Sequence, residues 1–536
     1  MSSKKDALAR ERRTGLTDKG KELLEAYIEA LSSSKCYPTR ADLNSLGFSR
    51  DSVRSHFGSL ERLKELAKKR NPKVVKEVIE EKIQDPAKLR LLERMLKKHK
   101  RFVIAAAEND CVVDRKAFRS LKALCKKMRA LLVILPMGKD LSRMDPILAN
   151  EFWIFKKTDL NSNFYISAIK VSPKSQNPLT SLARVGQRNG SMVLASPKQF
   201  LEFVAVGDNK FPHVLMSTGA ITLHKKGSLQ KNDILALDDH TIGAILVEIE
   251  DNQHFHFRQL QADDNGAFVD LGNYFNGDKV TKLLPTHFVI GDYHVTETDP
   301  RAAKAWDEVS ALVGKPKRIH HDFFSGVSVN HHEEHNLVRR AQLMSENRLS
   351  LEAELRICAK VLDEETEKCD EVTIVDSNHH DFVSKHYLPN GTYHKDPQNL
   401  AFASKLMVAM IEGHNPIRYA LETLIGLKNP HKVKWLQRDE SYRVAGIEVG
   451  AHGDKGSNGS QGSANTLEKA YGNCVVGHSH TPKIVRGFWQ VGTSSYLKLP
   501  YMVGSSSWCH TSCLIYPNGT RQFINVINGK WRLHKG

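Results

Sequence analysis

The sequence predicts a mixed α/β protein in which a small helical domain precedes two α/β regions. Apolar, strand-like segments alternate with long helical patterns from residue 287 onward, and residues 102–136 have the pattern of strand, helix and strand. Short helical segments fill residues 17–69. A chain of 536 residues also exceeds what one hydrophobic core usually serves, so we expect several domains.

The short N-terminal helices have the pattern of a helix-turn-helix. Gly47 is a turn residue, and Ser49 and Ser59 can cap the two helices that follow. Residues 50–57 would then be a recognition helix. We expect this helix to offer Arg50, Arg54 and His56 to a DNA groove. Trios of short helices also serve as plain packing modules, and that alternative stays open.

The positive charge of the chain is concentrated in its first quarter. The net charge is +17, and residues 1–130 hold 33 Lys and Arg against 18 Asp and Glu. Cationic side chains bind phosphate backbones because each contact releases counterions. The surplus therefore favours DNA as a partner, although a solvated helical surface that only aids solubility would have the same composition.

The remaining composition predicts a protein that stays in the cytoplasm. No apolar run is long enough to span a bilayer, and the charged N-terminus lacks the apolar core of a secretory signal. The eight cysteines are scattered, without the close pairs of a zinc site. We expect them to be reduced, mostly structural thiols.

Four segments follow from these patterns. We expect a basic helix-turn-helix-like domain over residues 1–70, a charged helical linker over 71–100, a mixed α/β accessory domain over 101–285, and a catalytic domain over 286–536. Residues 218–283 have a strand-rich pattern with turns at 264–266 and 276–278. The accessory domain has no recognisable catalytic or metal-binding motif, which favours a role as a scaffold or an oligomer contact.

The last segment places metal-ligand residue types at the ends of its predicted strands. Alternate residues that leave a strand point the same way, so Asp292 and His294 can bind one ion after the strand at 286–290. Asp322 follows a second strand end. The further candidates are Asn378 and His379, His452, and His478 with His480. Two close divalent ions need an anionic bridge, and this donor set suits manganese, iron or zinc better than calcium.

The order D-x-H, D, N-H, H, G-H-x-H resembles that of the calcineurin-like metallophosphoesterases over roughly residues 286–530. The resemblance implies a β-sandwich flanked by helices. It implies that Asp292, His294 and His480 hold a first ion, that Asn378, His452 and His478 hold a second, and that Asp322 bridges both. His379 falls where the family places the histidine that contacts the scissile phosphate and assists the leaving oxygen. A hydroxide held between two divalent ions, for which we expect Mn²⁺ with Fe, Zn or Mg as alternatives, would attack phosphorus in line.

Two positions depart from the family pattern, because His321 and Ser377 stand where glycine is usual. Both are positions of backbone geometry, which leaves Asp376 and Asp381 as rivals of Asp322 for the bridging role. The further histidines that can bind phosphate or cap the loop are His320, His331, His332 and His380.

The loop at residues 450–465 is rich in Gly, Ser and Asn. It lacks the Gly-Lys-Ser/Thr ending of a phosphate-binding loop. We expect instead a mobile flap over the metal site, from which Lys455 can contact a DNA phosphate.

Residues 452–459, 477–482 and 491–495 are similar to phosphoesterases encoded by tailed bacteriophages. The whole-chain layout resembles the pre-early DNA-transfer proteins of siphophages, which also degrade host DNA. This resemblance implies a metal-dependent DNase in the host cytoplasm, which we expect to be a homo-oligomer, and it allows a second phage early protein as a partner. The alternatives are a phosphatase or cyclic-nucleotide phosphodiesterase, and a non-catalytic DNA-binding or transfer scaffold.

Overall fold

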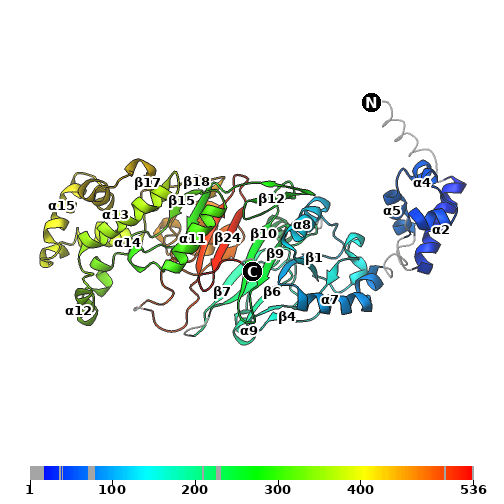
Figure 1. Ribbon diagram of the computed structural model, residues 1–536, viewed down its shortest axis with the longest axis horizontal. Coiled ribbons are helices and arrows are strands. Elements are labelled where there is room, and N and C mark those ends of the chain that lie inside the picture. The colour runs from blue at the N-terminus through cyan, green and yellow to red at the C-terminus, as the bar shows by residue number, and fades with distance from the viewer. Residues whose placement is uncertain are drawn as a thin grey trace, which may run out of the picture. The chain divides into compact units, whose positions relative to one another are not determined.

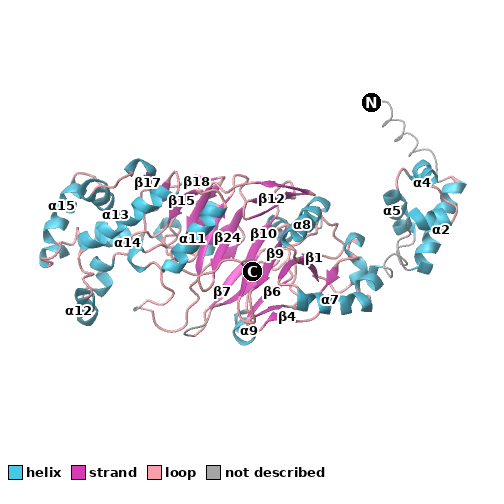
Figure 2. Cartoon of the chain, viewed as in Figure 1, coloured by secondary structure: helices cyan, strands magenta, loops and turns pink. Residues whose placement is uncertain are grey.

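The computed structural model describes residues 17–34, 38, 40–70, 79–207, 211–224, 231–499 and 502–533. Contacts divide the chain into two units. Unit 1 takes in residues 1–97, 108–112 and 138–153, and unit 2 takes in residues 98–107, 113–137 and 154–536. Figure 1 follows the chain by colour, and Figure 2 shows that unit 2 contains both helices and strands.

The N-terminal helices form where the capping residues predict them. They are α2 (Asp18–Ser34), α3 (Arg40–Ser45), α4 (Arg50–Phe57) and α5 (Leu60–Arg70). The Ser49 hydroxyl accepts the Ser52 N–H at 3.2 Å, and the Ser59 hydroxyl accepts the Arg62 N–H at 3.1 Å. Gly47 has a φ of 84°, which suits the turn between α3 and α4. The prediction of these helices and of their caps is confirmed.

Packing of the helices decides which face of α4 remains available. Leu23, Tyr27, Val53, Phe57 and Leu63 are buried together in one small core. Arg50 and Arg54 lie on the exposed side of α4. Of the expected charged linker, residues 71–78 lie outside the described residues, and α7 (Pro86–Lys98) is helical as expected.

Unit 2 begins with the predicted strand, helix and parallel strand. These elements are β1 (Arg101–Ala107), α8 (Arg115–Met128) and β2 (Leu131–Pro136). Asp114 caps α8 by accepting the N–H groups of Lys116 and Ala117. β1 pairs in parallel with β2 and antiparallel with β9 (Gly243–Ile249), which pairs with β10 (Phe255–Gln261). The strand-rich pattern of residues 218–283 is therefore largely confirmed, with one helix, α10 (Lys231–Asp238), inserted before β9.

A six-stranded sheet has the order β17-β16-β15-β14-β23-β24. Its strands are β14 (His287–Ile290), β15 (Lys317–His320), β16 (Val372–Ile374), β17 (Val433–Trp435), β23 (His510–Ile515) and β24 (Arg521–Val526). The first four are parallel to one another, and the helices α11 (Pro300–Leu312) and α13 (Leu351–Lys368) lie between them in the chain. α13 lies on the β17 side of this sheet in Figure 1.

A ten-stranded sheet joins two distant stretches of the chain. Its order is β18-β19-β20-β22-β21-β7-β8-β6-β5-β4. One half consists of β18 (Arg443–Val444), β19 (Ile447–Glu448), β20 (Cys474–Val476), β21 (Lys483–Val485) and β22 (Phe488–Gln490). The other half consists of β4 (Thr158–Asn161), β5 (Phe164–Ile166), β6 (Ser191–Leu194), β7 (Phe200–Val204) and β8 (His213–Ser217). β7 pairs with β21, so strands from both sides of the expected division at residue 286 share this sheet.

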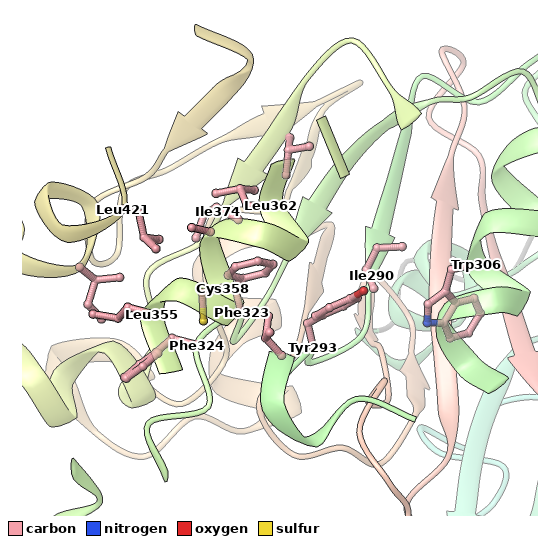
Figure 3. Packing of buried hydrophobic residues seen from close by; sticks show 14 of the residues in the cluster. Ile290, Tyr293, Trp306, Phe323, Phe324, Leu355, Cys358, Leu362, Ile374 and Leu421 are labelled. Atoms are coloured by element: carbon pink, nitrogen blue, oxygen red, sulfur yellow. The ribbon is translucent and has the colours of Figure 1, made fainter. Parts of the chain in front are cut away.

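The largest hydrophobic core packs against the six-stranded sheet. Figure 3 shows part of it, with Ile290 and Ile374 from the strands and Leu355, Cys358 and Leu362 from α13. All seven described cysteines are buried, as expected for structural thiols, and Cys36 lies outside the described residues. Within the described part of the chain, no helix combines the length and the apolar character that a membrane span requires.

A buried ionic cluster connects the accessory strands. The Arg258 guanidinium on β10 binds Glu248 on β9 at 2.9 Å and Asp270 of β11 (Phe268–Asp270) at 2.6 Å. Burial alone would raise the pKa of Glu248, but Arg258 and Arg101 outweigh it and lower that pKa overall. Gln522 on β24 donates to Asp270 at 3.0 Å, so the cluster also reaches the six-stranded sheet.

We expect Arg258→Met to destabilise unit 2 by about 3–5 kcal/mol, because the buried carboxylate of Asp270 loses its ion pair and buried Glu248 keeps only Arg101. Urea denaturation followed by circular dichroism measures the shift of the unfolding midpoint. The control is Arg356→Ala, which removes an exposed pair with Glu352 on α13 and should cost about 0.5 kcal/mol at most. Equal midpoints for the two variants would contradict the role of the cluster.

Candidate metal centre

The metal-ligand residue types gather at the carboxyl ends of parallel strands. Asp292 and His294 follow β14, and Asp322 follows the neighbouring strand β15. Asn378 begins the short helix α14 (Asn378–Asp381) after β16. From the ten-stranded sheet, His452 follows β19, and His478 and His480 follow β20, which is parallel to β19. Side chains that leave the same ends of adjacent strands converge, which is why residues distant in sequence meet here.

Asp292, His294, Asp322 and His480 form a buried cluster that can hold a metal ion. One ligand atom from each lies within 4.8 Å of the others. The Nε2 atoms of His294 and His480 are 3.0 Å apart. His480 Nε2 lies 3.3 Å from Asp292 Oδ2, and His294 Nε2 lies 3.6 Å from Asp322 Oδ2.

Residues expected at a second ion also lie near Asp322. His452 Nε2 is 3.5 Å from Asp322 Oδ2 and 2.9 Å from Asn378 Oδ1. The rings of His452 and His478 have centroids 5.3 Å apart. Asp322 is therefore within reach of both groups, which is the position that a bridging carboxylate requires.

Asp292 shows most clearly why the cluster fits a cation. The residue is fully buried, and neither carboxylate oxygen has a hydrogen-bond partner among the described residues. Burial raises the pKa of this carboxyl well above its usual range, Asp322 raises it further, and the nearby His478 backbone N–H opposes only part of the rise. A buried carboxylate of this kind is very costly unless a positive charge compensates it.

The surrounding imidazoles are held in their neutral form. Burial lowers the pKa of His294 and of His452 well below the usual range, and neighbouring histidines add to the effect. Burial lowers the pKa of His480 to about 3. A neutral imidazole has a lone pair for a metal ion, so these shifts favour ligation.

Backbone strain is concentrated at these residues. Four of the seven predicted ligands have left-handed φ angles, although none is glycine: His294 (46°), Asp322 (48°), His478 (78°) and His480 (59°). A strained backbone of this kind costs on the order of 1–3 kcal/mol per residue and is typical of functional sites. At position 477 only glycine fits, because a Cβ there would lie 2.1 Å from Asp292 Oδ1.

Core residues that alternate with the ligands hold the strand ends in place. Tyr293 lies between Asp292 and His294, and its ring stacks on Phe323, next to Asp322, with centroids 5.7 Å apart. Both rings belong to the large core (Figure 3). Beyond the strands, the His294 N–H donates to the Asp322 carbonyl at 2.8 Å. The core contact and this hydrogen bond thus hold the segments that carry Asp292 and Asp322 side by side.

His379 points toward the cluster from its edge. Its Nδ1–H donates to the Ser325 carbonyl at 2.6 Å, because a carbonyl can only accept. Nε2 then lies 3.8 Å from Asp322 Oδ2. Nearly a quarter of the side chain is exposed, at 23%, so the ring is partly open to solvent.

The two departures from the family pattern have different environments. His321 is fully buried, with neither ring nitrogen hydrogen-bonded among the described residues, and its ring stacks beside that of His452. The Ser377 hydroxyl contacts Asp322 Oδ1 and lies 2.7 Å from His380 Nδ1. Ser377 is thus a positioning residue for Asp322, which sequence reasoning missed because only the loss of glycine was visible.

The rival acids lie away from the cluster. Asp376 lies 3.7 Å from His380 Nδ1, and Asp381 binds Lys385 at 3.0 Å. Neither belongs to the four-residue cluster, whereas Asp322 does. Distance therefore favours Asp322 as the shared acid.

The additional histidines fall into two groups. His320 is buried and its Nε2 binds Glu365 at 3.1 Å, while His380 uses its Nδ1 to hold Ser377. His331 stacks against His332 and His386, with ring centroids 3.9 Å from each. These three partly exposed rings remain available to a phosphate.

The loop that carries Lys455 is held by backbone hydrogen bonds. The Gly456 N–H donates to Ser460, and the Gly462 N–H donates to Asp454. Lys455 is exposed, and its contact with DNA stays a prediction. Asp454 forms a close ion pair with Arg438, and sequence reasoning missed this pair because its members belong to different loops.

We expect Mn²⁺ to raise the melting temperature of the wild-type protein, because an ion that binds only the folded state stabilises it by about 2.7 kcal/mol at one hundred times its dissociation constant. Asp292→Asn should lose this stabilisation, and Asp381→Asn should keep it. In EDTA, Asp292→Asn should be at least as stable as the wild type, because it removes an unpartnered buried carboxylate. Differential scanning fluorimetry measures the melting temperatures of the wild type and both variants. If Mn²⁺ stabilised Asp292→Asn as much as the wild type, Asp292 would not be a metal ligand.

Comparison with known proteins finds a phage relative. The chain is 28% identical to Protein A1 of Escherichia phage T5 over 474 residues, which cover 81% of this chain and 83% of that protein. No family model and no solved structure matches the chain. The chain is therefore similar to a bacteriophage protein over most of its length.

Proposed function

We propose that the protein is a metal-dependent DNA nuclease with a calcineurin-like metallophosphoesterase centre. The observation that carries the proposal is the buried cluster of Asp292, His294, Asp322 and His480 at parallel strand ends. Its ligand types follow the order of that family. The proposed fold of this part is the family's β-sandwich, and the two large sheets that supply the ligands support it.

In this proposal the centre holds two divalent ions. Asp292, His294 and His480 would hold the first ion, Asn378, His452 and His478 the second, and Asp322 both. When bound, such ions lower the pKa of water and neutralise charge that builds on phosphoryl oxygens. Manganese suits these ligands, with Fe, Zn or Mg as alternatives.

The protein's own residues orient the phosphodiester and handle the proton of the leaving group. His379 is fixed through Nδ1 by the Ser325 carbonyl, so Nε2 faces the substrate side of Asp322. Its protonated ring can donate from Nε2 to the leaving oxygen. Ser377 holds Asp322 in the orientation that its shared role requires.

The basic first quarter supports DNA as the substrate. Residues 1–130 have a surplus of 15 positive charges, which suits a phosphate backbone and has no evident use for a small phosphoester. Arg50 and Arg54 on the exposed side of α4 are the proposed groove contacts, with His56 beside them and Lys455 on its own loop. The similarity to a bacteriophage protein supports a role in phage infection, and we propose that this role is the degradation of host DNA and phage DNA transfer.

We expect the purified protein to cut linear and supercoiled DNA with Mn²⁺ and to lose this activity in EDTA. His478→Ala should lower the rate by about 100-fold or more, because it removes a group that stabilises the transition state through the second ion. His335→Ala, at an exposed histidine, is the control. Agarose gels provide the readout. Cleavage of small phosphoesters alone would favour the phosphatase or cyclic-nucleotide phosphodiesterase, and DNA binding without cleavage under any metal would favour the scaffold.

We expect the double variant Arg50→Ala/Arg54→Ala to weaken DNA binding in EDTA, because it removes both proposed arginine contacts of α4. For every arginine that binds a phosphate, its removal should also reduce the slope of log K against log salt by about 1. Fluorescence anisotropy at several salt concentrations measures both. Arg356→Ala, outside the basic quarter, should leave affinity and slope unchanged. A double variant with wild-type slope would argue against α4 as the DNA-binding helix.

A further inference from the structure

A separate pocket of about 480 Å³ shares one wall with the metal centre. That wall is the segment at residues 376–380. Ser377 and Asn378 contact Asp322 and His452 of the centre, whereas Asp376 and His380 line the pocket. The other walls come from α16 (Pro416–Tyr419), the π-helical turn at Ala420–Ile425 and β17. None of the seven proposed metal ligands lines it.

Two buried polar atoms at this wall have no hydrogen-bond partner among the described residues, namely His380 Nε2 and Asp376 Oδ1. His380 is only 4% exposed. The Ser377 hydroxyl gives its one proton to the Asp322 carboxylate, so it accepts from His380 Nδ1 at 2.7 Å. The ring proton of the neutral histidine therefore lies on Nδ1, and Nε2 is an acceptor. The wall thus has two unused acceptors, His380 Nε2 and Asp376 Oδ1. Buried polar groups are normally satisfied, which points to a ligand.

The opposite walls are flat and aromatic. Tyr419 lines the pocket, and His414 stacks on it with ring centroids 5.4 Å apart and an interplanar angle of 25°. Trp435 is oriented by Glu422, which accepts its Nε1–H at 2.7 Å. Arg418 also lines the pocket, with about half of its side chain exposed, and its Nε pairs with Glu422 at 2.9 Å.

We propose that this pocket binds a nucleotide unit, with its base against the aromatic walls, its hydrogen-bonding edge toward His380 and Asp376, and its phosphate toward Arg418. A nucleobase is planar, and the exocyclic amino group of adenine, guanine or cytosine has two N–H donors, which complement the two acceptors of the wall. The volume lies within the usual range for small-ligand sites. The inference deepens the proposed nuclease function, since the base belongs either to a free nucleotide or to a DNA strand.

Occupation of the pocket bears directly on the metal centre. His380 uses Nδ1 to hold Ser377, and Ser377 contacts Asp322. The same short segment carries Asn378 and His379. A base that fixes His380 therefore also fixes residues proposed to bind metal and substrate.

The test is a titration of the full-length protein in EDTA with dAMP or with a single-stranded octanucleotide, followed by tryptophan fluorescence. EDTA removes phosphate binding at the metal centre. We expect saturable quenching from Trp435, which Trp435→Phe should remove, while equilibrium dialysis should still detect the bound dAMP. If dAMP quenches the fluorescence and the octanucleotide does not, the ligand is a free nucleotide. If the octanucleotide quenches it, the ligand is a base of the strand.

Matched variants separate the pocket from other sites. Asp376→Asn and Arg418→Ala should each weaken binding about tenfold, because each removes a charged hydrogen-bond partner. Arg356→Ala, which removes a similarly exposed helical pair, should have no effect. Absence of saturable quenching, equal affinity in all variants, or equally strong competition by inorganic phosphate would overturn the proposal. Because binding is measured without cleavage, its failure is distinguishable from failure of the nuclease.

Discussion

The burial of two carboxylates next to each other is the constraint on which the C-terminal region depends. Asp292 is removed from water and lacks hydrogen-bond partners among the described residues, and Asp322 is almost as deeply buried. Such a pair repels itself in a medium of low polarity, so a cation is its natural complement. The strained backbone at the ligands, the glycine at position 477 and the stacking of Tyr293 on Phe323 all hold this arrangement in place. The carboxylate pair and the strained backbone raise the energy of the metal-free protein, which favours the metal-bound one.

Much of the local architecture could be predicted from the sequence because its signals are local. The Ser49 and Ser59 caps, the β1–α8–β2 unit and the parallel strands before Asp292 and Asp322 each depend on residues within a short window. The convergence of the candidate ligands follows from those strands, since adjacent parallel strands end at the same edge. The identity of the metal and the chemistry remain proposals.

The features that could not be predicted depend on contacts between distant segments. From the sequence, Ser377 was notable only because glycine is usual at its position. Its contact with Asp322 requires that β15 and β16 be neighbours. The pairing of Arg438 with Asp454 and the pocket beside His380 likewise combine segments with no common motif. The same holds for the ten-stranded sheet, in which β7 carries no sign that β21 is its partner. Strand pairing across a long interval leaves no periodic trace in either strand.

The pairing of β7 with β21 also sets the order in which the protein can be completed on the ribosome. Strands β4 to β8 are synthesised long before β21, so the edge of β7 stays unpaired while a long further stretch of chain is made. β20, which leads into His478 and His480, belongs to the same late half of the sheet. The metal centre can therefore assemble only when nearly the whole chain has emerged. For an enzyme proposed to cut DNA, this order would keep incomplete chains inactive.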